Sequence, residues 1–281
     1  MKYIQREITG LISRKIKPGK VIIINGARRV GKTVLLKEII KDLKEPYLLL
    51  NGEDFNTLDL FSKRSAENYR QITGSKKILI IDEAQKIPEI GTILKLIADE
   101  LPHLRIIVTG SSAFDLKNIT GEPLTGRKES FTLFPLSERE FSQNESIVEK
   151  KDRLTERLIY GNYPELIHIG DRADKKDYLN ELVSSYLLKD ILVFENIRHS
   201  SKIFNLLRLI AFQTGNLVSC NELARQLSIS KNTVEKYLDL LTKVYILHKV
   251  EVNPIWKQGC SLIGNLVILV IVVLILFALV F

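Results

Sequence analysis

The chain has 281 residues, enough for one large domain or two modest ones, each with its own core. Hydrophobic residues make up 45% and charged residues 26%, as in a globular protein, and the net charge of +8 suits nucleic acid, nucleotide or an anionic membrane without selecting one. Cys220 and Cys260 lie far apart, and no Cys or His stands at metal-ligand spacing. With no apolar signal-peptide core at the N-terminus, the sequence predicts a reduced, cytoplasmic protein.

The most informative stretch runs from Val21 to Thr33, where four apolar β-formers lead into a loop that fits G-x-x-x-x-G-K-[ST]. Apolar residues at helical spacing follow it, so the sequence predicts strand, phosphate-binding loop and helix in succession. Such a loop wraps a polyphosphate with backbone N–H groups, Lys32 is expected to reach the β- and γ-phosphates, and the Thr33 hydroxyl is expected to bind Mg²⁺. The predicted nucleotide-binding residues are Gly26, Ala27, Arg28, Arg29, Val30, Gly31, Lys32, Thr33 and Val34.

Further strands are expected at Tyr47 to Asn51, predicted to be buried, at Ile78 to Ile81, at Arg105 to Thr109 and at Ser130 to Leu133. Helical or loop material separates them, and this alternation indicates right-handed crossovers and a parallel α/β sheet. Ile4, Ile8, Leu11 and Ile12 stand at helical spacing before the first strand and predict a short amphipathic helix.

Acidic residues end the Ile78 to Ile81 strand, at the edge where open α/β sheets bind ligands. Asp82 is expected to hold Mg²⁺, and Glu83 to orient and polarise the attacking water. The alternative is a solvated acidic turn.

Two more residues are candidates for catalysis. Thr109, rather than Ser111 or Ser112, is expected to sense the γ-phosphate or the water, the alternative being a plain strand cap. Arg127 is a candidate for approaching the triphosphate of its own or a neighbouring subunit, although a lone Arg is usually solvated.

The pattern divides the chain into an ATPase core over residues 1–135, a helical lid or connector over 136–215, a winged helix-turn-helix over 216–253 and an apolar tail over 254–281. The third part opens with a capping box at Ser219 to Glu222 and has a second helix from Lys231 to Val244, followed by a strand-like alternation. Lys231, Asn232 and Lys236 are candidates for contacting DNA, but acidic residues share that helix, and winged helices also serve as packing modules.

Five motifs, GARRVGKT, ILIIDEAQ, IIVTGSSA, LTGR followed by PLSEREF, and GNYPE, occur in the order found in a family of archaeal and bacterial AAA-type ATPases. The sequence resembles that family, which is related to the signal-transducing ATPases with numerous domains. The resemblance implies that Gly26 to Thr33 form the Walker A loop, that Asp82 and Glu83 are the Walker B pair, that Thr109 is the sensor and that Arg127 is a candidate arginine finger. It also implies ATP and Mg²⁺ as cofactors, a P-loop sheet with an additional strand between the Walker A and Walker B strands, and a winged helix.

The end of the chain departs from this resemblance, because the family usually continues into a restriction-endonuclease-like domain, which is missing here. Leu262 to Phe281 is instead uncharged, and twenty residues of helix at about 1.5 Å each match the thickness of a bilayer core. Trp256 and Lys257 precede it as interfacial residues would. A tail anchor to the cytoplasmic face, a buried core helix and a truncated or frameshifted end all stay open.

Two functions compete. The first is a Mg-dependent ATPase that acts as a conformational switch coupled to the winged helix, and Glu83 favours it. The second is a nucleotide-gated DNA- or protein-binding module with little or no hydrolysis. Neither hypothesis fixes the partner, and a homo-oligomer is compatible with both.

Overall fold

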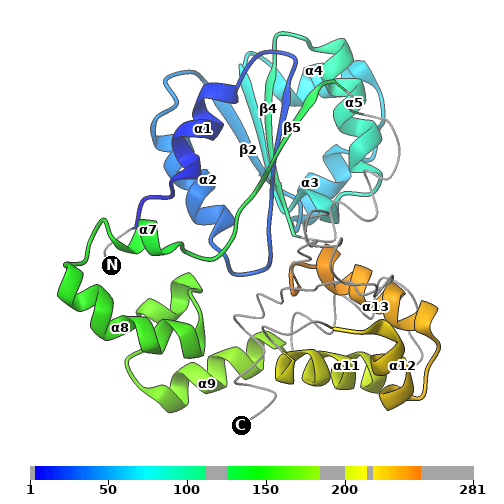
Figure 1. Cartoon of the computed structure of the whole chain (residues 1–281). Helices are drawn as coiled ribbons and strands as arrows, with labels where there is room; N and C mark the ends of the chain where they lie inside the picture. Colours follow the sequence, from blue (N-terminus) through cyan, green and yellow to red (C-terminus); the bar gives the residue numbers. More distant parts are fainter. Residues whose placement is uncertain (1–3, 112–123, 125, 184–199, 214–217, 248–281) are drawn as a thin grey trace, which may run out of the picture. The chain divides into compact units, whose positions relative to one another are not determined.

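The computed structural model describes residues 4–111, 124, 126–183, 200–213 and 218–247. The chain divides into two compact units, Met1–Ser146 and Ile147–Phe281. Unit 1 is an α/β sandwich, and the described part of unit 2 is helical (Figure 1).

Unit 1 is built on a five-stranded parallel sheet in the order β2-β3-β4-β1-β5. The strands are β1 (Val21–Asn25), β2 (Tyr47–Asn51), β3 (Ile78–Asp82), β4 (Arg105–Gly110) and β5 (Lys128–Thr132). The expected strands therefore all form, and β4 lies between β1 and β3 as the additional strand. Because the sheet is parallel, the carboxyl ends of β1, β3 and β4 meet at one edge.

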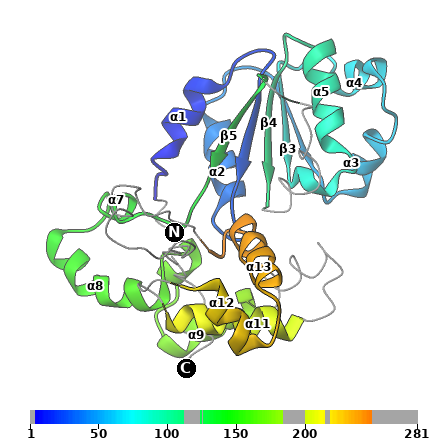
Figure 2. The same ribbon diagram turned by 45° about the vertical axis from the view of Figure 1, so that its right-hand side comes forward.

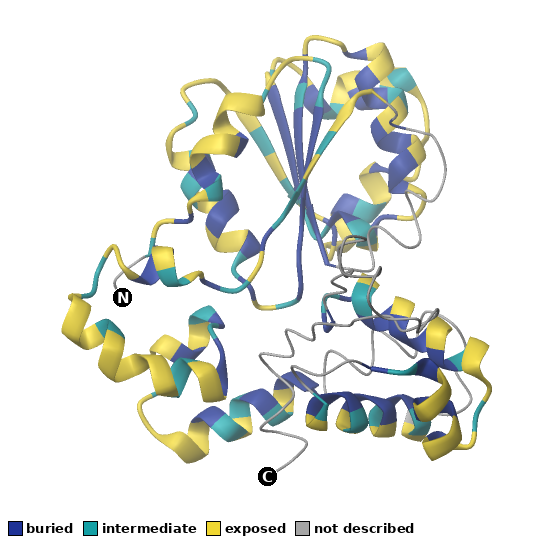
Figure 3. Cartoon of the chain, viewed as in Figure 1, coloured by how far each residue is buried: buried dark blue, intermediate teal, exposed yellow. Residues whose placement is uncertain are grey.

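Helices cover both faces of this sheet, with α1 and α2 on one face and α3, α4 and α5 on the other (Figures 1 and 2). The helices of unit 1 are α1 (Ile8–Lys15), α2 (Lys32–Lys41), α3 (Phe55–Leu60), α4 (Ala66–Thr73), the 3₁₀ turn η1 (Ala84–Lys86), α5 (Ile90–Glu100) and α7 (Glu138–Phe141). Successive strand side chains point to opposite faces, so every residue of β1 is buried. Figure 3 shows this buried centre as dark strands between helices whose outer faces are exposed.

The position of β2 corrects one expectation. Tyr47 to Asn51 was expected to be a buried strand, but Tyr47 and Leu49 are exposed, and only Leu48 and Leu50 pack towards the core. The reason is the strand order, because β2 is an edge strand with β3 as its neighbour on one side. The buried apolar face of helix α1 is also narrower than expected, because Ile12 is fully buried whereas Leu11 is exposed.

The described helices of unit 2 are α8 (Ile147–Tyr160), η2 (Pro164–Ile167), α9 (Arg172–Glu181), α11 (Ser200–Phe212), α12 (Cys220–Leu227) and α13 (Lys231–Lys243). The apolar stripe expected on α11 is buried and packs in one core with α12 and α13. Its residues are Ile203, Leu206, Leu207 and Ile210. Tyr163, between α8 and η2, is also buried, and burial raises the pKa of its hydroxyl, with a smaller contribution from Tyr178. The phenol therefore stays neutral to a higher pH than that of an exposed tyrosine.

Helices α12 and α13 form the expected helix–turn–helix pair. Ser219 caps α12 by accepting from the Glu222 backbone N–H, and Ser230 caps α13 by accepting from the Thr233 N–H. Ser228 makes the turn in a left-handed conformation. The expected wing is not seen in Tyr245 to Leu247, which are not in a strand, and the rest of it lies outside the described residues.

The apolar tail, Leu262 to Phe281, also lies outside the described residues, so its interpretation as an anchor stays a prediction. Within the ranges that the structure describes, no helix combines the length and apolar character needed to cross a membrane.

Candidate functional site

The phosphate loop connects β1 to α2, and its glycines are required by its shape. Gly26 has φ 154°, and a Cβ there would lie 2.3 Å from the Leu133 carbonyl oxygen. Gly31 has φ 97° and precedes the first residue of α2. A side chain at either position would therefore distort the loop. Of the other predicted loop residues, Ala27 and Val30 are buried, Arg29 adopts φ 61°, and Val34 is exposed on α2.

Lys32 lies within the loop. Its side chain is buried, and Nζ donates to the carbonyl oxygens of Gly26 and Ala27, at 3.0 Å each. The lysine is thus fixed by the backbone of the loop it belongs to, at the N-terminus of α2, where the helix dipole adds positive potential. An ammonium group in this position is suited to bind a phosphate oxygen.

Three elements bring side chains together at the carboxyl edge of the sheet. Thr33 Oγ1, on α2, donates to Asp82 Oδ2 at 2.8 Å. Thr109 Oγ1, on β4, donates to Asp82 Oδ1 and accepts from the Glu83 backbone N–H at 3.1 Å. Asp82 is therefore held on both carboxylate oxygens, and the described contacts of the Thr109 hydroxyl orient the Asp82–Glu83 pair.

Glu83 occupies a strained position directly after β3. It has φ 51° and ψ 43°, in the left-handed region that a side chain disfavours. Two neighbours that the sequence did not single out support it. Gln85 Nε2 donates to Glu83 Oε2, and Gly52 lies so close that an added Cβ would be 2.4 Å from the Glu83 carbonyl oxygen. Gln85 stands inside the motif ILIIDEAQ, which is the signal that could have found it.

The pairing of Thr33 with Asp82 fits a magnesium site. A hydroxyl and a carboxylate oxygen are hard donors, and Mg²⁺ in phosphate sites commonly uses one or two protein oxygens besides phosphate and water. In the described part of the chain no group of three or more His, Cys, Asp or Glu residues is placed to hold a metal ion. Thr33 and Asp82 would supply two such protein oxygens.

The structure does not bring Arg127 into this cluster. Its carbonyl accepts from the Val21 N–H, and Lys128 is in register with Val21, so Arg127 lies at the amino ends of the strands. There its guanidinium pairs with Asp99 of α5. The phosphate loop follows the other end of β1, so an action of Arg127 on its own subunit's triphosphate does not fit this geometry. Of the two serines weighed against Thr109, Ser111 is buried and Ser112 lies outside the described residues.

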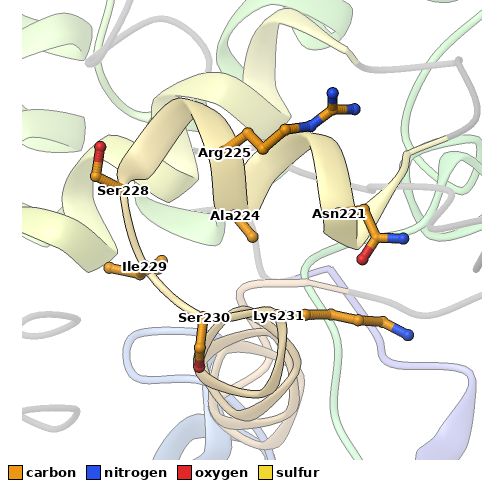
Figure 4. Close-up of a pocket in the computed structure, with 7 residues that line it drawn as sticks. All are labelled: Asn221, Ala224, Arg225, Ser228, Ile229, Ser230 and Lys231. Atoms are coloured by element: carbon orange, nitrogen blue, oxygen red, sulfur yellow. The ribbon is translucent and has the colours of Figure 1, made fainter.

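The predicted DNA-contacting residues lie on α13 of unit 2. Lys231 Nζ pairs with Glu235 one turn along the same helix, at 3.4 Å, and Lys243 pairs with Asp239 at 2.7 Å. A shallow pocket of about 690 Å³ lies between α12 and the start of α13. Figure 4 shows the polar ends of Asn221 and Lys231 on the same side of this pocket. Asn232 and Lys236 are not among its lining residues.

Fold and site together define unit 1 as a P-loop NTPase: a five-stranded parallel sheet with a phosphate loop after β1 and an acidic residue at the end of β3. Residues 18–142 match a protein-family model described as an AAA domain. Residues 151–253 match a domain of unknown function (DUF8612). The chain thus joins a P-loop NTPase domain that matches an AAA-domain model to a second matched domain whose role is open.

The curated relatives are distant. An uncharacterized protein of Mycobacterium tuberculosis is 26% identical over 246 residues, which cover 87% of this chain and 53% of the relative. An uncharacterized protein of Methanocaldococcus jannaschii is 27% identical over 255 residues, covering 84% and 57%. The chain therefore spans little more than half the length of these relatives.

Among solved structures, a signal transduction ATPase with numerous domains from Pyrococcus horikoshii gives a TM-score of 0.41 at 15% identity, covering 98% of this chain and 42% of that one. A RuvB protein of Thermotoga maritima gives 0.38 at 15% identity, covering 94% and 90%. Likenesses at this distance carry no conclusion about function.

Proposed function

We propose that the protein is a Mg²⁺-dependent ATPase whose hydrolysis cycle acts as a conformational switch on unit 2. The observation that carries this proposal is the convergence of Thr33, Asp82, Thr109 and Glu83 at one edge of the sheet, beside the lysine of the phosphate loop. These residues come from α2, β3 and β4, and from the position after β3. A pattern of this kind supports phosphoryl-transfer chemistry, which depends on positioning and charge stabilisation.

Each residue has a distinct role in the proposed reaction. The loop N–H groups and Lys32 bind the phosphate oxygens, and Thr33 with Asp82 holds the metal ion. Glu83 orients the attacking water and accepts its proton, while Thr109 positions the Asp82–Glu83 pair through its bonds to the Asp82 carboxylate and the Glu83 backbone N–H. Bound Mg²⁺ would supply charge neutralisation at the β- and γ-phosphates.

The coupling to unit 2 is the finer part of the proposal. The chain leaves the sheet at Thr132, passes the phosphate loop at Leu133, whose N–H donates to the Asn25 carbonyl at 2.7 Å, and continues through α7 to the end of unit 1 at Ser146. On this proposal a change at the loop passes through this hydrogen bond to Leu133 and then along the chain to unit 2. On this proposal α12 and α13, with a wing, report the nucleotide state to a DNA or protein partner.

One observation favours a second function, a nucleotide-gated binding module with little hydrolysis. The Gln85 amide donates to Glu83 Oε2, so one of the two carboxylate oxygens that could accept a proton from water is already engaged. A base restrained in this way would act slowly. On this alternative the bound nucleotide, rather than turnover, sets the affinity of unit 2 for its partner.

A phosphate-release assay separates the two functions. Wild-type protein with ATP and Mg²⁺ is expected to release phosphate, while EDTA abolishes release and Glu83→Gln lowers it by on the order of 10³-fold with ATP still bound. Fluorescent ATP-analogue titration checks that binding survives. Equal release by wild type and Glu83→Gln above the EDTA background would refute the assigned base. Release at the EDTA background in both proteins would leave the binding-module function.

A further inference from the structure

The guanidinium of Arg6 lies behind the phosphate loop and contacts two separate segments of unit 1. Nη1 donates to the Val30 carbonyl oxygen at 3.2 Å, and Nη2 donates to the Phe134 carbonyl oxygen. Nε donates to Glu140 Oε1 at 3.1 Å. Arg6 therefore joins the segment before α1, the phosphate loop and the segment that leads to α7.

Glu140 fixes the orientation of this arginine. Both side chains of the pair are only 7% exposed. Glu140 Oε1 also accepts from the Glu7 N–H at 2.9 Å, and Oε2 accepts from the Ser137 N–H at 2.9 Å in the capping box that opens α7. The carboxylate thus has partners on both oxygens, so the planar fork of Arg6 has a defined direction.

The contact with Val30 has a consequence for the phosphate-facing side of the loop. Val30 and Gly31 share one peptide unit, and no cis peptide bond occurs among the described residues, so its C=O and N–H point in opposite directions. A guanidinium that holds the Val30 oxygen from behind therefore turns the Gly31 N–H away from Arg6, towards the inside of the loop. The charge-assisted bond also polarises that peptide and strengthens its N–H as a donor.

We propose that Arg6, held by Glu140, is a positioning residue of the nucleotide site, which aims the Gly31 N–H at the bound phosphates and keeps the loop against the segment of residues 133–141. The pair is buried on the side that the Val30 carbonyl faces, opposite the Gly31 N–H. A buried ion pair is often no more stabilising than apolar residues of the same size, so stability alone does not account for it. The inference rests on the proposed ATP site and deepens it.

The test compares ATP affinity with thermal stability. Arg6→Met is expected to weaken ATP binding by about tenfold or more, the loss typical of a charge-assisted hydrogen bond. Arg6→Lys keeps the charge but cannot reach three acceptors on two segments, so its affinity should fall between wild type and Arg6→Met. Fluorescent ATP-analogue titration at a temperature where all variants are folded gives the affinities, and thermal melts give the stabilities.

Two controls separate positioning from a general loss of stability. Leu94→Ala removes a fully buried side chain from α5, and is expected to lower the melting temperature without changing ATP affinity. Arg70→Met breaks an exposed pair with Glu100, and should change neither. If Arg6→Met fails to fold, the decision rests on Arg6→Lys and on Glu140→Gln, which is expected to weaken ATP binding in the same direction.

The outcomes are distinguishable. A wild-type protein that does not bind ATP refutes the proposed ATP site before any variant is measured. A wild type that binds ATP, with Arg6→Lys and Glu140→Gln binding equally well, overturns the positioning role and leaves the ATP site intact. The positioning role is supported if the Arg6 and Glu140 variants lose ATP affinity although their melting temperatures are no lower than that of Leu94→Ala, and Leu94→Ala itself binds ATP normally.

Discussion

Two regions of this protein use polar side chains in opposite ways. At the carboxyl edge of the sheet in unit 1, Thr33, Asp82 and Thr109 come from positions 27 to 76 residues apart and meet in one hydrogen-bonded group. On α13 of unit 2, Lys231 and Lys243 instead pair with acidic residues one turn away on their own helix.

This difference distinguishes side chains that are placed to act on a ligand from ion pairs that only stabilise their own helix. Pairs four residues apart form on many isolated helices and need no fold to bring them together. A cluster assembled from three elements exists only in the folded protein, and it leaves Asp82 oriented by two hydroxyl groups. We therefore expect large functional effects from single substitutions at the sheet edge and small ones on α13.

The largest expected effect is at Lys32. Lys32→Ala removes the ammonium group from the centre of the phosphate loop and is expected to abolish measurable ATP binding while the sheet stays folded. Titration with a fluorescent ATP analogue checks the binding, and circular dichroism checks the fold. An ATP affinity within threefold of that of the wild type would mean that the nucleotide binds elsewhere. The large effects expected at the sheet edge would then be contradicted.

Thr109→Val is expected to have a smaller effect than Lys32→Ala or Glu83→Gln. The change keeps the volume but removes the hydroxyl that donates to Asp82 and accepts from the Glu83 N–H. Loss of a supporting hydrogen bond of this kind typically costs about 10- to 100-fold in activity. Steady-state phosphate release is expected to show the loss mainly in kcat, with Thr109→Ser restoring most of it. A Thr109→Ser variant as slow as Thr109→Val would point to packing rather than the hydroxyl.

Replacement of Lys231 and Lys236 by Ala tests whether α13 of unit 2 contacts DNA. If unit 2 binds DNA through α13, the double variant should bind more weakly, and the slope of log affinity against log salt should fall by about one unit for each lost phosphate contact. Lys243→Ala, which breaks an equivalent pair at the other end of the helix, is the control. Gel-shift titrations that detect no binding by the intact protein would leave α13 a packing or protein-binding role.

Arg127→Ala is expected to have the smallest effect. Its pair with Asp99 is partly exposed, and such pairs contribute about 1 kcal/mol or less to stability. ATP affinity at low protein concentration should be unchanged because Arg127 lies at the amino ends of the strands. A loss of turnover seen only at high protein concentration would indicate that Arg127 acts on a neighbouring subunit. A loss of ATP affinity in the monomer would contradict its position.

Much of unit 1 could be predicted from the sequence because its signals are local. The apolar run of β1, the glycines of the loop and the acidic end of β3 each specify their structure within a few residues. The edge position of β2 could not be predicted, because YLLLN is as apolar as a central strand, and its exposure depends on which strands lie beside it.

The parts of the site that the sequence did not reveal depend on distance along the chain or on direction. Arg6 and Glu140 are 134 positions apart, and nothing local to either predicts that they meet. Arg127 is the last residue of the LTGR motif of the resembled family, but its place before the strand expected at Ser130 to Leu133 puts it at the amino ends of a parallel sheet, so the direction of the strand and not the motif decides where it lies. Unit 2 shows the same limit, since capping residues predict α12 and α13 but not what they bind.

The left-handed backbone of Glu83 sets stability against activity at a single residue. A side chain in that conformation costs about 1 kcal/mol relative to glycine, and Gly52 is pressed against the same peptide, so the strain cannot be relieved by a shift towards β2. Selection for stability alone would favour Gly or Asn at this position. A more heat-resistant but inactive Glu83→Gly protein would be the expected sign that the fold carries this strain for its chemistry.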